Sequence, residues 1–148
     1  MNYHILYLED DPRMRRHTTD MLINKGYDVV SFRRIDQAKE YFADNHNNIA
    51  CVIVDLNMSD EWLGEYRSES QGGIISGWVW LQRYVREIAP NMNAIIYSGY
   101  IDFLKEHLGK NEDELLKEYN IRCIKKGVGE SDGFNGLVET LRNLEIRD

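Results

Sequence analysis

The chain has 148 residues, of which 43% are hydrophobic and 29% charged, and its net charge is −7. This length suits a domain that can bury a core without disulfides, and the composition excludes wholesale disorder. No apolar run is long enough to span a bilayer, and the first residues lack the features of a signal peptide. The acidic charge disfavours direct binding to nucleic acid. Cys51 and Cys123 lack the spacing of a zinc site, so we expect a cytoplasmic protein with reduced thiols.

Short apolar runs alternate with helical patterns along the chain. We expect strands at residues 3–8, 28–32, 49–54, 94–97 and 121–124. We expect helices at 12–25, around 38–42, at 77–88, at 101–119 with an interruption near 109–111, and around 134–144. Asp11 suits the N-cap of the first helix and Pro12 its first residue.

This alternation predicts an α/β fold, in which a doubly wound, five-stranded parallel sheet carries helices on both faces. The run 49–54 is the most continuous apolar segment and predicts a central strand. No internal repeat, low-complexity tract or linker is present, so we expect a single domain over residues 1–148.

Polar residues follow four of the five predicted strands. In open parallel sheets the site lies beyond the carboxyl ends of the strands, so these residues should meet at one edge. They are Glu9, Asp10 and Asp11 after the first strand, Asp55 after the third, Ser98 after the fourth, and Lys125 and Lys126 after the fifth. The first three also have a simpler explanation, because acidic residues favour a helix N-terminus.

Carboxylates gathered in this way repel one another unless a cation lies among them. Hard oxygen ligands suit Mg²⁺, with Mn²⁺ as the alternative. A carboxylate beside such an ion, with a lysine and a hydroxyl nearby, can accept a phosphoryl group, because the cation and the lysine neutralise the transferred oxygens.

Four motifs at these strand ends resemble those of bacterial response-regulator receiver domains. They are residues 6–12 (LYLEDDP), 52–58 (VIVDLNM), 96–100 (IYSGY) and 123–127 (CIKKG). The resemblance covers essentially the whole chain, and it implies a flavodoxin-like fold with strand order 2-1-3-4-5. It also implies a phosphoacceptor of a two-component system or phosphorelay. Such a protein receives its phosphoryl group from a sensor histidine kinase or phosphotransfer protein and signals to an output protein by direct contact.

The resemblance also implies the ligands of the ion and the acceptor. Asp55 matches the phosphoacceptor, which becomes an aspartyl phosphate. Glu9 and Asp10 match the acidic pair, with Asp10 as the direct Mg²⁺ ligand, and the main-chain carbonyl of Asn57 completes the protein ligands.

Two further residues match the family's machinery. Ser98 matches the switch hydroxyl and Lys126 the family lysine, although a slip of one residue would exchange Lys126 for Lys125. Domains of this family catalyse only their own phosphorylation and dephosphorylation, so we do not expect an enzyme in the usual sense. We expect a stand-alone regulator that acts on a partner, and a fragment of a longer protein is the alternative.

The chain departs from the family pattern in several places. Gly127 replaces the usual proline after the lysine, which puts the family's cis peptide in question. Cys123 stands at the position of the switch aromatic, and Ser59 replaces a proline that commonly follows the phosphoacceptor loop. Two segments are longer than the family norm, namely an inserted loop at about 59–76 and the fourth-helix region at about 101–119.

These departures keep a second hypothesis open, in which the chain is a non-phosphorylated pseudo-receiver that binds other proteins. A Mg²⁺-dependent phosphohydrolase of the haloacid dehalogenase type is less favoured, because such enzymes need an acid two residues after the nucleophile and Asn57 stands there. No glycine-rich dinucleotide or Walker motif follows a predicted strand.

The tryptophans give one further expectation. Trp78 lies on the apolar face of its predicted helix and belongs in the core, whereas Trp80 lies off that face. We therefore expect the inserted loop to cover Trp80 through Trp62 or Tyr66.

Overall fold

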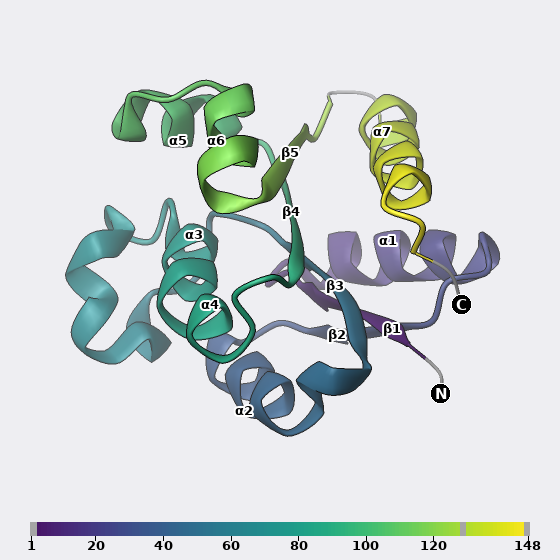
Figure 1. Cartoon of the computed structure of the whole chain (residues 1–148), viewed down its shortest axis with the longest axis horizontal. Helices are drawn as coiled ribbons and strands as arrows, with labels where there is room; N and C mark the ends of the chain where they lie inside the picture. Colours follow the sequence, from purple (N-terminus) through teal and green to yellow (C-terminus); the bar gives the residue numbers. More distant parts are fainter. Residues whose placement is uncertain (1–2, 128–129, 147–148) are drawn as a thin grey trace.

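The computed structural model describes residues 3–127 and 130–146. Its five strands form one parallel sheet in the order β2-β1-β3-β4-β5, which confirms the predicted topology (Figure 1). The strands are β1 (His4–Leu8), β2 (Val29–Phe32), β3 (Ile49–Val54), β4 (Asn93–Ser98) and β5 (Ile121–Lys125). The register pairs Leu8 with Phe32 on one side and with Val54 on the other, so these three strands end at the same edge.

Helices cover both faces of the sheet. The segments are α1 (Pro12–Asn24), α2 (Ile35–Asn45), η1 (His46–Asn48), η2 (Glu61–Ser70), α3 (Ser76–Trp80), η3 (Leu81–Val85), α4 (Arg86–Ile88), α5 (Ile101–Leu108), α6 (Glu112–Tyr119) and α7 (Glu130–Asn143). Figure 1 shows α1 and α7 on one side of the sheet and α2 to α6 on the other. No helix among the residues described is long and apolar enough to cross a membrane.

The sheet divides the core into two clusters because successive strand side chains point to opposite faces. Ile5 and Tyr7 of β1 belong to the cluster under α1 and α7, whereas Leu6 and Leu8 belong to the cluster under α2, α3 and their neighbours. All six side chains of β3 lie in one or the other cluster or against it. This burial confirms β3 as a central strand.

The start of α1 confirms the capping expected from the sequence. The Asp11 carboxylate accepts hydrogen bonds from the backbone N–H groups of Arg13 and Met14, and Pro12 is the first helical residue. These bonds satisfy donors that a helix leaves free in its first turn. The same cap places Glu9 and Asp10 directly before the helix, at the carboxyl edge of the sheet.

The helix that starts at Ser76 differs from the predicted amphipathic pattern. Trp78 is buried as expected, but Trp80 is also fully buried and Ile88 is 39% exposed. A π-helical turn at Leu81–Val85 interrupts the α-helical periodicity and shifts the residues after it. Trp80 contacts the ring of Phe42 in α2 edge-on.

The inserted segment packs against α2 and the helix that starts at Ser76. Trp62 stacks under the guanidinium of Arg34 and Tyr66 packs edge-on against Tyr84, so each ring has an identified partner, and the expectation that one of them covers Trp80 stays a prediction. Trp80 is fully buried in the core cluster against which Tyr66 also packs.

The longer region between β4 and β5 forms two helices instead of one. Gly109 ends α5 in a left-handed conformation, and Asn111 begins α6 with a capping box to Glu114. The predicted interruption near 109–111 is therefore confirmed. It has a local cause, because these residues both stop one helix and start the next.

Candidate functional site

Backbone hydrogen bonds continue past the strand ends and hold the polar residues in register. The N–H of Glu9 donates to Phe32, that of Asp55 donates to Leu8, and that of Lys126 donates to Ser98. The distances are 3.0, 3.1 and 3.1 Å. These bonds tie β1 to both β2 and β3, and β4 to β5, and they fix Glu9, Asp55 and Lys126 directly after their strands.

The carboxylates of Glu9, Asp10 and Asp55 come together at this edge, with one oxygen from each within 4.8 Å of the others. Glu9 is 1% exposed and Asp55 is 9% exposed, whereas Asp10 is open to solvent. Burying carboxylates without compensation is costly. The group therefore needs positive charge, and one side is open from which a cation can enter.

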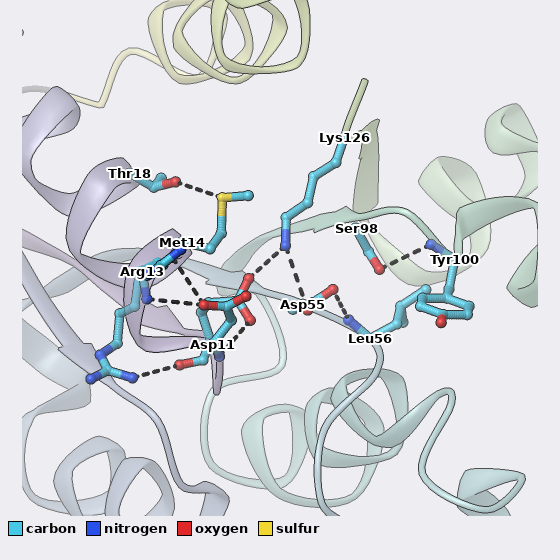
Figure 2. Close-up of polar contacts among 11 residues, drawn as sticks. Asp11, Arg13, Met14, Thr18, Asp55, Leu56, Ser98, Tyr100 and Lys126 are labelled. Atoms are coloured by element: carbon cyan, nitrogen blue, oxygen red, sulfur yellow. Dashed lines mark hydrogen bonds and ion pairs between the residues drawn. The ribbon is translucent and has the colours of Figure 1, made fainter. Parts of the chain in front are cut away.

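Lys126, directly after β5, supplies part of that charge (Figure 2). Its ammonium donates to Glu9 Oε1 at 2.5 Å and lies 3.5 Å from Asp55 Oδ2. Lys125 points elsewhere and pairs with the exposed Asp102 at 2.7 Å. The structure thus brings Lys126, and not Lys125, to the carboxylates.

The pKa shifts at this edge reflect burial first and the neighbouring carboxylates second. Burial and the Asp55 carboxylate raise the pKa of Glu9 to about 7, against the opposing effect of Lys126. The same two causes raise the pKa of Asp10. Burial lowers the pKa of Lys126, but the Asp55 and Glu9 carboxylates outweigh that effect and the net shift is upward. A site in which several carboxylates repel one another favours a divalent cation.

The carboxylate of Asp55 is held in one orientation. Its Oδ1 accepts a hydrogen bond from the backbone N–H of Leu56 at 2.8 Å, which leaves Oδ2 on the side of Lys126 (Figure 2). The backbone is equally constrained, because a Cβ placed on Gly77 would lie 2.0 Å from the Asp55 carbonyl oxygen. Gly77 is therefore required by this close approach, a role that the sequence pattern alone did not reveal.

Ser98 and Asn57 also lie at the carboxyl edge. The Ser98 hydroxyl is fully buried and accepts a hydrogen bond from the N–H of Tyr100 at 3.1 Å. Within the described part of the chain it makes no hydrogen bond to Asp55. Asn57 follows Asp55 by two residues and is exposed.

The structure also describes the positions that depart from the family pattern. Cys123 is half-buried and has a free thiol, like Cys51. No cis peptide occurs among the residues described, so the bond between Lys126 and Gly127 is trans. The ring of Tyr97 lies beside the lysine, with its centroid 5.4 Å from the Lys126 ammonium.

A divalent ion fits the donors found here. Glu9, Asp10 and Asp55 offer hard oxygen atoms close enough together to share one small cation, and Asp10 keeps the site open to water. Mg²⁺ is bound in proteins by one or two carboxylates together with several water molecules. The donor chemistry therefore suits Mg²⁺ better than a softer metal.

Comparisons with known proteins agree with this architecture. No family model and no curated protein matches the chain. Solved structures do match. A response-regulator receiver domain protein from Clostridium thermocellum is 22% identical, with a TM-score of 0.64 over 96% of this chain and 98% of its own. The response regulator TrrA from Thermotoga maritima, solved with Mg²⁺ and BeF, is 19% identical, with a TM-score of 0.65 over 96% and 98%.

A third similar structure is the receiver domain of the hybrid histidine kinase CckA, which is 19% identical, with a TM-score of 0.64 over 95% of this chain and 97% of its own. The strand order and these likenesses define the fold. The chain has the flavodoxin-like fold of response-regulator receiver domains.

Proposed function

We propose that this protein is a phosphoacceptor receiver that takes a phosphoryl group onto Asp55 and signals by protein contact. The observation that carries the proposal is the position of Lys126, whose ammonium lies 3.5 Å from Asp55 Oδ2 beside three converging carboxylates. A buried aspartate with a cation site and a lysine at the same oxygen matches the requirements of an acceptor whose product is a charged acyl phosphate.

The donor in this proposal is a phosphohistidine of a sensor kinase or phosphotransfer protein. Asp55 Oδ2 forms the new P–O bond, the P–N bond to the imidazole breaks, and the imidazole leaves with its electron pair and takes up a proton. The Leu56 N–H holds Oδ1, so the carboxylate presents Oδ2 in a fixed orientation. Asp10, Asp55 and the Asn57 carbonyl would hold Mg²⁺, which would supply positive charge to the transferred oxygens.

Two residues respond to the product in this proposal. The Lys126 ammonium pairs with one phosphoryl oxygen and is released in part from Glu9, its present partner. The Ser98 hydroxyl, which now accepts from the Tyr100 N–H, turns to donate to another phosphoryl oxygen. Since Tyr100 directly precedes α5, the loss of that bond alters the start of this helix and provides a route to an output protein.

The test is incubation of the purified chain with acetyl phosphate, with and without Mg²⁺, followed by intact-mass measurement of a base-labile adduct. We expect an adduct that requires both Mg²⁺ and Asp55 and is lost in Asp55→Asn. Asp102→Asn is the matched control, because it removes an exposed carboxylate and should leave the adduct unchanged. A folded wild-type chain that forms no adduct with acetyl phosphate or phosphoramidate would contradict the proposal and favour the pseudo-receiver.

We also propose that the protein works in the cytoplasm, where its kinase partner would present the phosphohistidine. The free thiols of Cys51 and Cys123 support this location, because reducing conditions keep such thiols free.

A further inference from the structure

The two ends of the inserted segment meet at a single residue, Met58. The N–H of Met58 donates to the carbonyl of Gly73 at 3.2 Å, and the hydroxyl of Ser76 donates to the carbonyl of Met58 at 2.9 Å. Met58 is 4% exposed and Ser76 is fully buried, so water does not compete for these bonds. The base of the insertion therefore holds the residue that follows Asn57 at both of its backbone polar groups.

The bond at Met58 also orients Asn57. The Met58 N–H and the Asn57 carbonyl belong to one peptide group, which is planar and trans among the described residues. In a trans peptide the N–H and the carbonyl point in opposite directions. The hydrogen bond to Gly73 therefore turns the Asn57 carbonyl oxygen away from the insertion.

The Asn57 carbonyl differs from the carbonyls on either side of it. The carbonyl of Leu56 accepts from the N–H of Gly77 at 3.0 Å, and the carbonyl of Met58 accepts from Ser76. Between them, the Asn57 carbonyl accepts no hydrogen bond from any residue that the structure describes. The two neighbouring carbonyls are hydrogen-bonded, whereas the Asn57 carbonyl can still accept a cation, as a main-chain metal ligand must.

The backbone at Gly73 has a conformation and a close contact that suit glycine. Its φ is +100°, and a Cβ added there would lie 2.9 Å from the Met58 carbonyl oxygen. The preceding Gly72 has a similar positive φ of +68°, but a Cβ there would meet nothing within 4 Å. Both glycines therefore carry backbone strain on substitution, and only a side chain on Gly73 would touch the held residue.

We infer that Gly73 and Ser76, at the base of the insertion, are positioning residues that hold the Asn57 carbonyl in place for the divalent cation. This inference rests on the proposed function, because the cation is the one that Glu9, Asp10 and Asp55 would share. A ligand that is already oriented loses little freedom when the ion binds, and the groups that orient metal ligands typically change metal affinity 10–100-fold when they are removed.

The test measures Mg²⁺ affinity directly, by titrating Mg²⁺ into the ¹⁵N-labelled chain and following the amide signals of the carboxyl edge. We expect Gly73→Ala and Ser76→Ala each to raise the dissociation constant for Mg²⁺ roughly 10-fold. Gly72→Ala is the matched control and should bind like wild type. Ser76→Thr keeps the hydroxyl and should restore most of the affinity, which a purely structural role of the side chain would not require.

Each outcome bears on a different statement. If the folded Gly73→Ala and Ser76→Ala variants bind Mg²⁺ as tightly as wild type, the positioning role is overturned while the metal site stands. If wild type shows no Mg²⁺ binding that Asp10→Asn abolishes, the metal site of the proposed function falls, and this inference falls with it. If Gly73→Ala does not fold, the Mg²⁺ affinities of Ser76→Ala and Ser76→Thr test the positioning role by themselves.

Discussion

Lys126 and Glu9 form the tightest contact of the carboxyl edge, at 2.5 Å, and they are 117 positions apart in the chain. Glu9 is almost fully buried, and the side chain of Lys126 is 16% exposed. The pair joins the first strand to the last. It also keeps the ammonium beside Asp55, so one interaction serves both the stability of this edge and its chemistry.

Removing this lysine should therefore cost stability. We expect Lys126→Met to lower the free energy of unfolding by about 1–3 kcal/mol, because it leaves a buried carboxylate without its donor. Lys125→Met is the control, since its partner Asp102 is exposed, and the midpoint of urea unfolding should not move. Equal midpoints for wild type and Lys126→Met would show that the pair contributes nothing.

Two helical glycines should respond in opposite directions to alanine. A Cβ on Gly77 would lie 2.0 Å from the Asp55 carbonyl, and the backbone there cannot move without displacing the site. We expect Gly77→Ala to destabilise the protein by more than about 2 kcal/mol.

Gly136, in contrast, has space for the methyl group, since its Cβ would lie 3.5 Å from a side-chain atom of Ile124. We expect Gly136→Ala to stabilise the protein by about 0.5–1 kcal/mol through helix propensity. Urea unfolding of both variants checks the pair. A stabilised Gly77→Ala would show that the close approach at Asp55 is not required.

The tryptophans should differ in their access to a quencher. Trp80 is fully buried and Trp78 is 8% exposed, whereas Trp62 is 36% exposed and has the Arg34 guanidinium over its ring. We expect acrylamide to quench a minor part of the fluorescence, and Trp62→Phe to abolish that part. Strong quenching that persists in Trp62→Phe would mean that Trp80 or Trp78 is open to solvent.

The thiols should be unreactive near neutral pH. Burial raises the pKa of Cys51 and of Cys123 to about 12, so the reactive thiolate is scarce at pH 8 in the folded protein. We expect Ellman's reagent to label neither cysteine rapidly at pH 8 and to label both after unfolding in urea. Labelling should accelerate as the pH rises from 8 towards 12. Rapid labelling of one thiol at pH 8 would contradict its burial.

The sequence alone determined the order of strands and helices and the place of the candidate site. Parallel strands end at one edge, so residues such as Glu9, Asp55 and Ser98 had to gather there once the alternation of strands and helices was recognised. Local signals determined the start of α1 at Pro12 and the break between α5 and α6 near Gly109, because caps and left-handed turns depend on neighbouring residues.

Only the tertiary structure decided which of two adjacent lysines faces the carboxylates. The N–H of Lys126 pairs with the Ser98 carbonyl, and this register turns its side chain towards Glu9 while Lys125 turns towards Asp102. The π-helical turn after Trp80 was likewise invisible, because a pattern read at 3.6 residues per turn assumes a regular helix.

The conformation of the inserted segment was the feature least predictable from the sequence. Its length identified a long loop, but its conformation depends on contacts with distant partners, such as Glu69 with Arg83 and Trp62 with Arg34. Such contacts leave no periodic trace in the sequence, because each is a single pairing between surfaces that folding brings together. The same folding places Gly73 and Ser76 against Met58, beside the carbonyl that the metal site would use.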